Sequence, residues 1–196
     1  MNDEVFPPAV LTTERLVLRP FTPADAADVH AVWQDQRFIG SAPMGYPYAG
    51  ADLEAAAAWC TTGIEQRRLD GKGIGFAVVP RAGGRLVAHV SLFGADWVTR
   101  TAEIHYWTAP WARGHGFAAE SAGAVARWAL TTQHFERIAL LADTSNTASR
   151  HVAASAGFRF EGVLRSAALT RTGDRADTAV YSMIRTDLAA HPVAVA

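Results

Sequence analysis

The chain has little cysteine and almost no net charge. Among its 196 residues Cys60 is the single cysteine, so no intramolecular disulfide can form and a reducing compartment fits. Cys60 follows Trp59 in an alanine-rich run. Free cysteines usually bury as small hydrophobic residues, so we expect it to pack in the core rather than act as a nucleophile. The formal net charge is -1, which gives no electrostatic basis for a nucleic-acid partner.

Long apolar runs are also missing. No stretch approaches the roughly 18 apolar residues that a membrane-spanning helix needs. The first ten residues, MNDEVFPPAV, are acidic and lack the basic start and apolar centre of a signal peptide. These absences predict a cytoplasmic protein with no membrane partner.

What the chain does contain is typical of one folded domain. Hydrophobic residues make up 49% and charged residues 19%, which excludes wholesale disorder, and the length suffices for a real core. No linker, repeat or low-complexity segment divides it. We interpret residues 1–11 as a loose lead-in, residues 12–188 as a single domain and residues 189–196 as a flexible tail.

Periodicity and turn residues predict the element order β-α-α-β-β-β-α-β-α-β-β. The strands are expected at residues 11–19, 76–79, 86–93, 101–107, 137–142, 158–170 and 176–185. The helices are expected at residues 23–33, 51–69, 119–130 and 148–156. Residues 36–49 show no periodicity and are expected to form a loop that lines a pocket. This order predicts an α/β (α+β) domain with a mixed sheet and helices on its faces.

The most informative segment is the glycine-rich turn at residues 113–118, between the strand at 101–107 and the next helix. Such a turn directs backbone N–H groups at one spot, and the helix dipole adds partial positive charge there. Gly114 and Gly116 allow a bulky anion to approach the backbone. By itself the segment predicts a phosphate-like anion at a helix N-terminus, and a purely structural turn remains an alternative.

A dinucleotide-binding fingerprint is a second interpretation of these residues. Gly114, Gly116 and Ala119 match the spacing G-x-G-x-x-A. However, the segment lies in mid-chain between predicted antiparallel hairpins. The acidic residue expected about 20 positions later would be Glu136, which begins the next strand instead of ending it. We therefore favour another phosphate-bearing ligand.

Arg113, Gly116 and Ala118 resemble the R/Q-x-x-G-x-G/A signature of the GNAT acetyltransferases. Further segments are similar to the ribosomal-protein alanine/serine N-acetyltransferase (RimJ/RimL-like) branch of that family. These segments are residues 13–19, 102–107, 113–120, 146–158 and 180–188. The resemblance extends over residues 12–188. It implies a single-domain GNAT fold, with a mixed, mostly antiparallel sheet of about seven strands and helices on both faces.

The resemblance also implies acetyl-CoA as co-substrate. The backbone amides of residues 113–118 would bind its pyrophosphate, and the backbone of the strand at 101–107 would pair with its pantetheine arm as an added strand would. The cofactor contacts expected on this basis are Tyr106, Trp107, Thr108, Arg113, Gly114, His115, Gly116, Phe117, Ala118, Asn146 and Ser149. No metal is expected.

Two residues are expected to carry the catalysis. Glu103 is the candidate base, acting through a water, and shares a strand face with His105, the second candidate. A structural ion pair for Glu103 stays open. Many GNAT enzymes place a tyrosine where this chain has Ala153. Ser149 is therefore expected to donate to the CoA thiolate, while Asn146 either contacts the pantetheine or caps the helix.

The resemblance implies an N-acetyltransferase that acts on a primary amine by direct attack in a ternary complex, with a protein N-terminal α-amine as first candidate. One alternative keeps the fold but changes the donor, for instance to succinyl-CoA, or takes a small-molecule amine. A second alternative is a non-catalytic CoA-binding sensor or interaction module. The expected partners are acetyl-CoA and the amine acceptor, with a homodimer left open.

Overall fold

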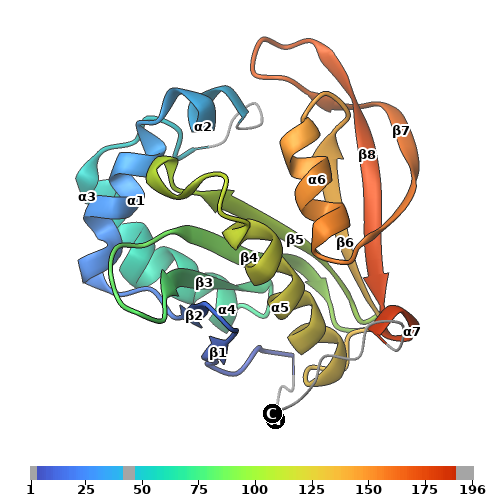
Figure 1. Ribbon diagram of the computed structural model, residues 1–196, viewed down its shortest axis with the longest axis horizontal. Helices are drawn as coiled ribbons and strands as arrows, with labels where there is room; N and C mark the ends of the chain where they lie inside the picture. Colours follow the sequence, from blue (N-terminus) through green and yellow to red (C-terminus); the bar gives the residue numbers. More distant parts are fainter. Residues whose placement is uncertain (1–3, 42–46, 189–196) are drawn as a thin grey trace.

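The computed structural model describes residues 4–41 and 47–188, and its strands form one sheet in the order β1-β2-β3-β4-β5-β6-β8-β7 (Figure 1). The strands are β1 (Leu11–Thr12), β2 (Leu16–Arg19), β3 (Gly73–Pro80), β4 (Ala88–Asp96), β5 (Thr101–Thr108), β6 (Arg137–Asp143), β7 (Arg159–Leu169) and β8 (Arg175–Ile184). The α-helices are α1 (Ala26–Trp33), α2 (Gln36–Ser41), α3 (Leu53–Ala58), α4 (Ile64–Leu69), α5 (Phe117–Thr131), α6 (Thr147–Ser155) and α7 (Arg185–Leu188). Short 3₁₀ turns occupy Pro23–Asp25 and Pro110–Ala112.

Neighbouring strands are antiparallel except β5 and β6, which run parallel. Helices α5 and α6 pack on one face of the sheet, whereas α1, α3 and α4 cover the other face over β2–β4 (Figure 1). The expectation of a mixed, mostly antiparallel sheet with helices on both faces is therefore confirmed. Buried side chains from both layers meet the sheet in one continuous core.

The sheet has eight strands rather than about seven because the predicted first strand is interrupted. The Thr13 backbone N–H donates to the carbonyl of Leu16, at 2.9 Å, and the Thr13 hydroxyl accepts from the Leu16 N–H at 3.0 Å. These bonds reverse the chain at residues 13–15, so β1 and β2 pair with each other instead of forming one strand.

The predicted helix at 51–69 forms as α3, one π-helical turn (Trp59–Gly63) and α4. Asp52 caps α3, because its side chain accepts from the N–H of Ala55. The expectation of a loop at 36–49 is wrong in its first part. Residues 36–41 form α2, whose first turn is held by a bond from the Phe38 N–H to the Asp35 carboxylate. Residues 42–46 lie outside the described part of the chain.

The described part of the lead-in, residues 4–11, is anchored at Phe6. Residues 5–10 form no helix or strand, but Phe6 is fully buried and packs against the rings of Trp97 and Phe135. Arg68 donates to the carbonyl of Phe6 at 2.6 Å. The predicted tail at 189–196 falls outside the described residues. Within residues 4–41 and 47–188, every helix is too short or too polar to cross a bilayer.

Candidate active site

Strand β5 has one paired edge and one mostly open edge. On the first edge it pairs with β4 from Glu103, opposite Phe93, to Thr108, opposite Ala88. On the second edge it pairs with β6 only at residues 101–103. Beyond Glu103 the two strands part (Figure 1), because β6 follows β8 along its whole length.

The open edge provides backbone donors and acceptors for an extended ligand. Residues 104–108 have no strand partner there within the described chain, and unpaired backbone groups of this kind are what an added strand binds. The five steps from Glu103 to Thr108 span about 17 Å at the usual rise of a strand. The predicted pantetheine contacts Tyr106, Trp107 and Thr108 all lie on this stretch.

The loop at 113–118 leads from the end of β5 into α5. Gly114 and Gly116 adopt left-handed φ angles of 81° and 76°, which glycine tolerates best. No atom lies within 4 Å of the position a Cβ would take on Gly114, so that side of the loop is open. Gly116 is the N-cap of the 15-residue helix α5, whose first N–H groups have no partner within the helix. The loop and the helix dipole together fit a pyrophosphate.

Side chains of the loop are used to hold its shape. Arg113 forms an ion pair with Asp35, at the junction of α1 and α2. Its guanidinium donates to the Asp35 carboxyl and holds the pKa of that group below its usual range. His115 stacks on Phe117, and its Nδ1 lies 2.9 Å from the carbonyl oxygen of Arg113. The backbone amides of the loop, rather than these side chains, are therefore the groups left to meet an anion.

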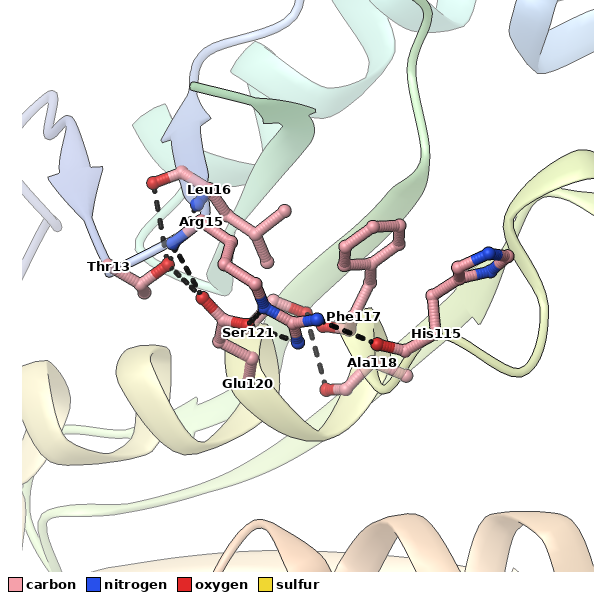
Figure 2. Close-up of polar contacts among 8 residues, drawn as sticks. All are labelled: Thr13, Arg15, Leu16, His115, Phe117, Ala118, Glu120 and Ser121. Atoms are coloured by element: carbon pink, nitrogen blue, oxygen red, sulfur yellow. Dashed lines mark hydrogen bonds and ion pairs between the residues drawn. The ribbon is translucent and has the colours of Figure 1, made fainter. Parts of the chain in front are cut away.

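Arg15 links the loop to β2 and α5, a role that the sequence analysis missed (Figure 2). Its Nε donates to Glu120 at 2.7 Å and its Nη1 donates to the carbonyl of His115 at 3.0 Å. Burial alone would raise the pKa of Glu120, but hydrogen bonds from Thr13 and Arg15 outweigh burial and lower the pKa. The guanidinium also lies 3.6 Å from the Cβ position of Gly116, so it adds positive charge beside the loop.

The candidate base lies where β5 and β6 part. Glu103, His105 and Trp107 share one face of β5, as predicted. It is the face toward α3 and α4, because the ring of Trp107 contacts His89, which in turn contacts Trp59. The pKa of the Glu103 carboxyl is raised by burial. In the part of the chain that the structure describes, the side chain of Glu103 makes no hydrogen bond or ion pair. The alternative of a structural ion pair for Glu103 therefore finds no support.

His105 lies beside this carboxylate on the same face but is a weaker candidate. Burial, with a smaller contribution from the positive charge of Arg67, lowers its pKa to about 4. The imidazole is therefore neutral at physiological pH and has little capacity to hold a proton. Its neighbour Trp107 is 5% exposed and contacts the rings of Phe38 and His89, closing this side of the strand.

Beyond Glu103 the strands β5 and β6 leave a gap between them. Ser149 lies across this gap, on α6. The side-chain oxygen of Asn146 accepts from the N–H of Ser149 at 3.0 Å, so Asn146 caps the helix. Tyr106, on the face of β5 opposite to Glu103, brings its hydroxyl to 2.7 Å from the Ser149 Oγ. Burial raises the pKa of Tyr106 to about 12. This hydroxyl pair was not foreseen, because the sequence analysis gave Tyr106 a backbone role only.

The remaining chemistry-bearing groups lie apart from this gap. Cys60 is 2% exposed and burial raises its pKa to about 12, which confirms packing as its role. Ala153, at the position where the resemblance implies a tyrosine, is fully buried. Across residues 4–41 and 47–188, no three His, Cys, Asp or Glu side chains gather as a metal site would require.

Comparisons with known proteins identify the family of the chain. The sequence profile of the Acetyltransferase (GNAT) domain matches residues 15–159. A curated relative, the uncharacterized N-acetyltransferase YoaA of Bacillus subtilis, is 28% identical over 179 residues, which cover 90% of this chain and 97% of that protein.

Solved structures share the fold. RimJ of Mycobacterium smegmatis in complex with CoA-disulfide has a TM-score of 0.80 at 24% identity, covering 92% of this chain and 90% of that one. The ribosomal-protein-S5-alanine acetyltransferase of Vibrio fischeri has a TM-score of 0.77 at 17% identity, covering 91% and 98%. The predicted fold is thereby confirmed, with eight strands.

Proposed function

The chain belongs to the GNAT acetyltransferase family, and from that premise we propose that it acetylates protein N-terminal α-amines by direct attack in a ternary complex. Acetyl-CoA is the co-substrate and supplies the activated acetyl group as a thioester. The observation that carries the proposal is the open edge of β5. Glu103 lies at its start on one face, Tyr106 with Ser149 on the other, and the amide-lined loop at its end.

The residues at this edge fit acetyl-CoA. The pyrophosphate would bind the amides of residues 113–118, and the pantetheine arm would pair with the backbone of Tyr106, Trp107 and Thr108. The thioester would then lie near the point where β5 and β6 part. Asn146 keeps its amide nitrogen as a donor toward the arm, since only its oxygen serves the helix cap.

The base and the thiolate donor face the reaction from opposite sides of β5. Glu103 lies on the face of α1, α3 and α4, so the amine would approach from there, lose its proton to the carboxylate through a water, and attack. Ser149 lies on the face of α6 and would donate to the sulfur that leaves. This division requires no covalent acyl-enzyme, in agreement with the buried thiol of Cys60.

The modest base favours an α-amine over a lysine side chain. An α-amine with a pKa near 8 is about one-quarter neutral at about pH 7.5, whereas a lysine with a pKa near 10.4 is about one part in a thousand neutral. Glu103 is one half-buried carboxylate, and its neighbour His105 has a pKa of about 4. Glu103 and His105 together are basic enough to accept the proton of an α-amine that is already partly neutral, but not to deprotonate a lysine side chain efficiently. The alanine acetyltransferase among the structural neighbours supports the same class of acceptor.

Thiol release from acetyl-CoA tests the proposal. The acceptors are peptides that begin with Ala or Ser, the same peptides with a blocked N-terminus and one internal lysine, and a polyamine. We expect turnover with the free N-termini and none with the blocked peptides. Turnover confined to the polyamine, or faster turnover with succinyl-CoA than with acetyl-CoA, would overturn the proposed substrates. Tight CoA binding without turnover on any acceptor would instead indicate the sensor.

A further inference from the structure

Two hydroxyl groups from distant parts of the chain meet beside the gap. The Tyr106 hydroxyl lies 2.7 Å from the Ser149 Oγ and 3.2 Å from the Ser149 carbonyl oxygen, although the residues are 43 positions apart. We propose that Tyr106 is a positioning residue: its phenol donates to the Ser149 Oγ and thereby turns the serine proton toward the CoA sulfur. The inference rests on the proposed role of Ser149.

The donor count at this pair supports the assignment. A serine hydroxyl has one proton. Unless the phenol of Tyr106 donates to the Ser149 Oγ, the serine can donate that proton to the phenol oxygen instead of to the sulfur. The phenol also has one proton and two acceptors within reach, of which the Oγ is the nearer. When the phenol donates to the Oγ, the serine proton is left free for the sulfur. Asn146 fixes the first turn of α6, so the Oγ has a defined position.

The relative acidities make this a hydrogen bond and not a proton relay. In the reaction the amine nitrogen forms the C–N bond, the C–S bond breaks, and its electron pair leaves with the sulfur. The amine proton goes to Glu103 through water, and the thiolate takes a proton from solvent after release. A thiol has a pKa near 8.5, whereas the pKa of Tyr106 is about 12. The phenol therefore remains protonated throughout and polarises Ser149 without giving up its proton.

The arrangement also accounts for the residue at position 153. The resemblance to the GNAT enzymes implies a tyrosine at that position of this helix, but Ala153 is fully buried here and has no polar group. In this chain the phenol comes from Tyr106 on β5, and Ser149, one turn before Ala153, is the residue that contacts the thiolate.

The test uses Tyr106→Phe, Ser149→Ala and the double variant. Tyr181→Phe is the matched control, because the Tyr181 hydroxyl also contacts α6, through the Nε of Arg150 at 3.2 Å. The first readout is the pKa of the thiol of bound CoA, followed by the ultraviolet absorbance of the thiolate as pH is raised. The second readout is kcat and KM with acetyl-CoA and an Ala peptide.

We expect Ser149→Ala to lower kcat about tenfold or more and Tyr106→Phe about three- to tenfold, as the loss of a charge-assisted and a neutral hydrogen bond would. KM for acetyl-CoA should change little. Both variants should raise the pKa of bound CoA. In the Ser149→Ala background Tyr106→Phe should have no further effect, because it acts through Ser149. Tyr181→Phe should match the wild type in both readouts.

Equal effects of Tyr106→Phe with and without Ser149, or the same losses in Tyr181→Phe, would overturn the inference. The inference would also be overturned if the thiol of CoA bound to the Tyr106→Phe single variant had the same pKa as in the wild type. If Ser149→Ala also behaves as the wild type, the proposed role of Ser149 fails with it. Absence of turnover on every acceptor would contradict the proposed function, but the titration of bound CoA would still decide the role of Tyr106.

Discussion

Glu103 combines burial with the absence of a counter-charge. Burial raises its pKa, and no cation or hydrogen-bond donor of the described residues compensates the carboxylate. A buried carboxylate of this kind costs stability when it is ionised, and it is the kind of group that an active site retains for its chemistry.

Replacing Glu103 with Gln should therefore separate activity from stability. We expect kcat to fall about a hundredfold, the usual order for a lost general base. As pH falls through the raised pKa of Glu103, the wild-type rate should decline more steeply than protonation of the amine alone requires, and this extra decline should vanish in the variant. A folded-state pKa above the unfolded one means that the carboxyl stabilises the fold when protonated and costs stability as pH rises past that pKa.

At neutral pH the Glu103→Gln variant should accordingly unfold at a higher temperature than the wild type. His105→Gln serves as the comparison, because His105 lies on the same face and is already neutral. An unchanged rate in Glu103→Gln would remove Glu103 from the role of base, and a lower unfolding temperature would show that its buried carboxylate does not cost stability.

At the residue scale, part of the candidate site was predictable from the sequence. Strand alternation placed Glu103 and His105 on one face, and helix-capping preference offered the observed cap as one of two roles for Asn146. The contact between Tyr106 and Ser149 could not be predicted, because it depends on how α6 is placed against β5. The same holds for Arg15, which reaches Glu120 over a separation of 105 residues.

Among the elements, the parting of β5 and β6 and the loop that follows β5 create the candidate site. The strand, the glycine turn and α5 were all predictable from local patterns. The pairing of β5 with β6 over only three residues could not be predicted. The two strands are joined through α5, and where they pair depends on β6 following β8. The helix α2 was missed since its six residues carry no clear periodicity, and the split of the first strand depends on one threonine hydroxyl.

The glycine turn offers a test with a control inside the same chain. Gly114 and Gly83 have φ angles of 81° and 85°, and neither has an atom within 4 Å of its Cβ position. Alanine at either position should cost about 1 kcal/mol of folding free energy, from the left-handed backbone alone. Denaturant unfolding measures that cost, and titration with CoA measures the binding.

We expect only Gly114→Ala to weaken CoA binding, because Gly83 lies in the turn between β3 and β4, away from the loop. A similar loss of affinity in both variants would show that the loop glycines serve the fold and not the ligand.

Over the whole molecule, buried histidines should make the fold sensitive to mild acid. Burial lowers the pKa of His89 to about 3 and that of His105 to about 4, with smaller electrostatic contributions. Both remain neutral in the folded state, whereas an unfolded chain protonates them below about pH 6.5. Stability should therefore rise with pH between about pH 4 and 6.5, by at most about 2.7 kcal/mol per pH unit for two protons.

Below this window the carboxylates with lowered pKa values act in the same direction. Hydrogen bonds from Arg137 and Ser182 lower the pKa of Glu161 to about 2. Glu161 therefore stabilises the fold at pH values above its unfolded pKa, and this stabilisation is lost as pH falls toward 2. Free energies of unfolding from urea titrations at a series of pH values measure both windows. The slope near pH 5 should fall to about half in His105→Gln. A slope as steep as in the wild type would show that His105 is not the source.

The central claim is that acetyl-CoA lies along the open edge of β5 with its pyrophosphate at the start of α5. Amide hydrogen exchange with and without CoA tests it most directly. We predict that CoA slows exchange in two segments together, residues 104–108 and residues 113–119, and leaves the β7–β8 hairpin unchanged. Slowing at residues 113–119 alone would mean an anion at the helix N-terminus without a ligand in the gap, and would contradict the account.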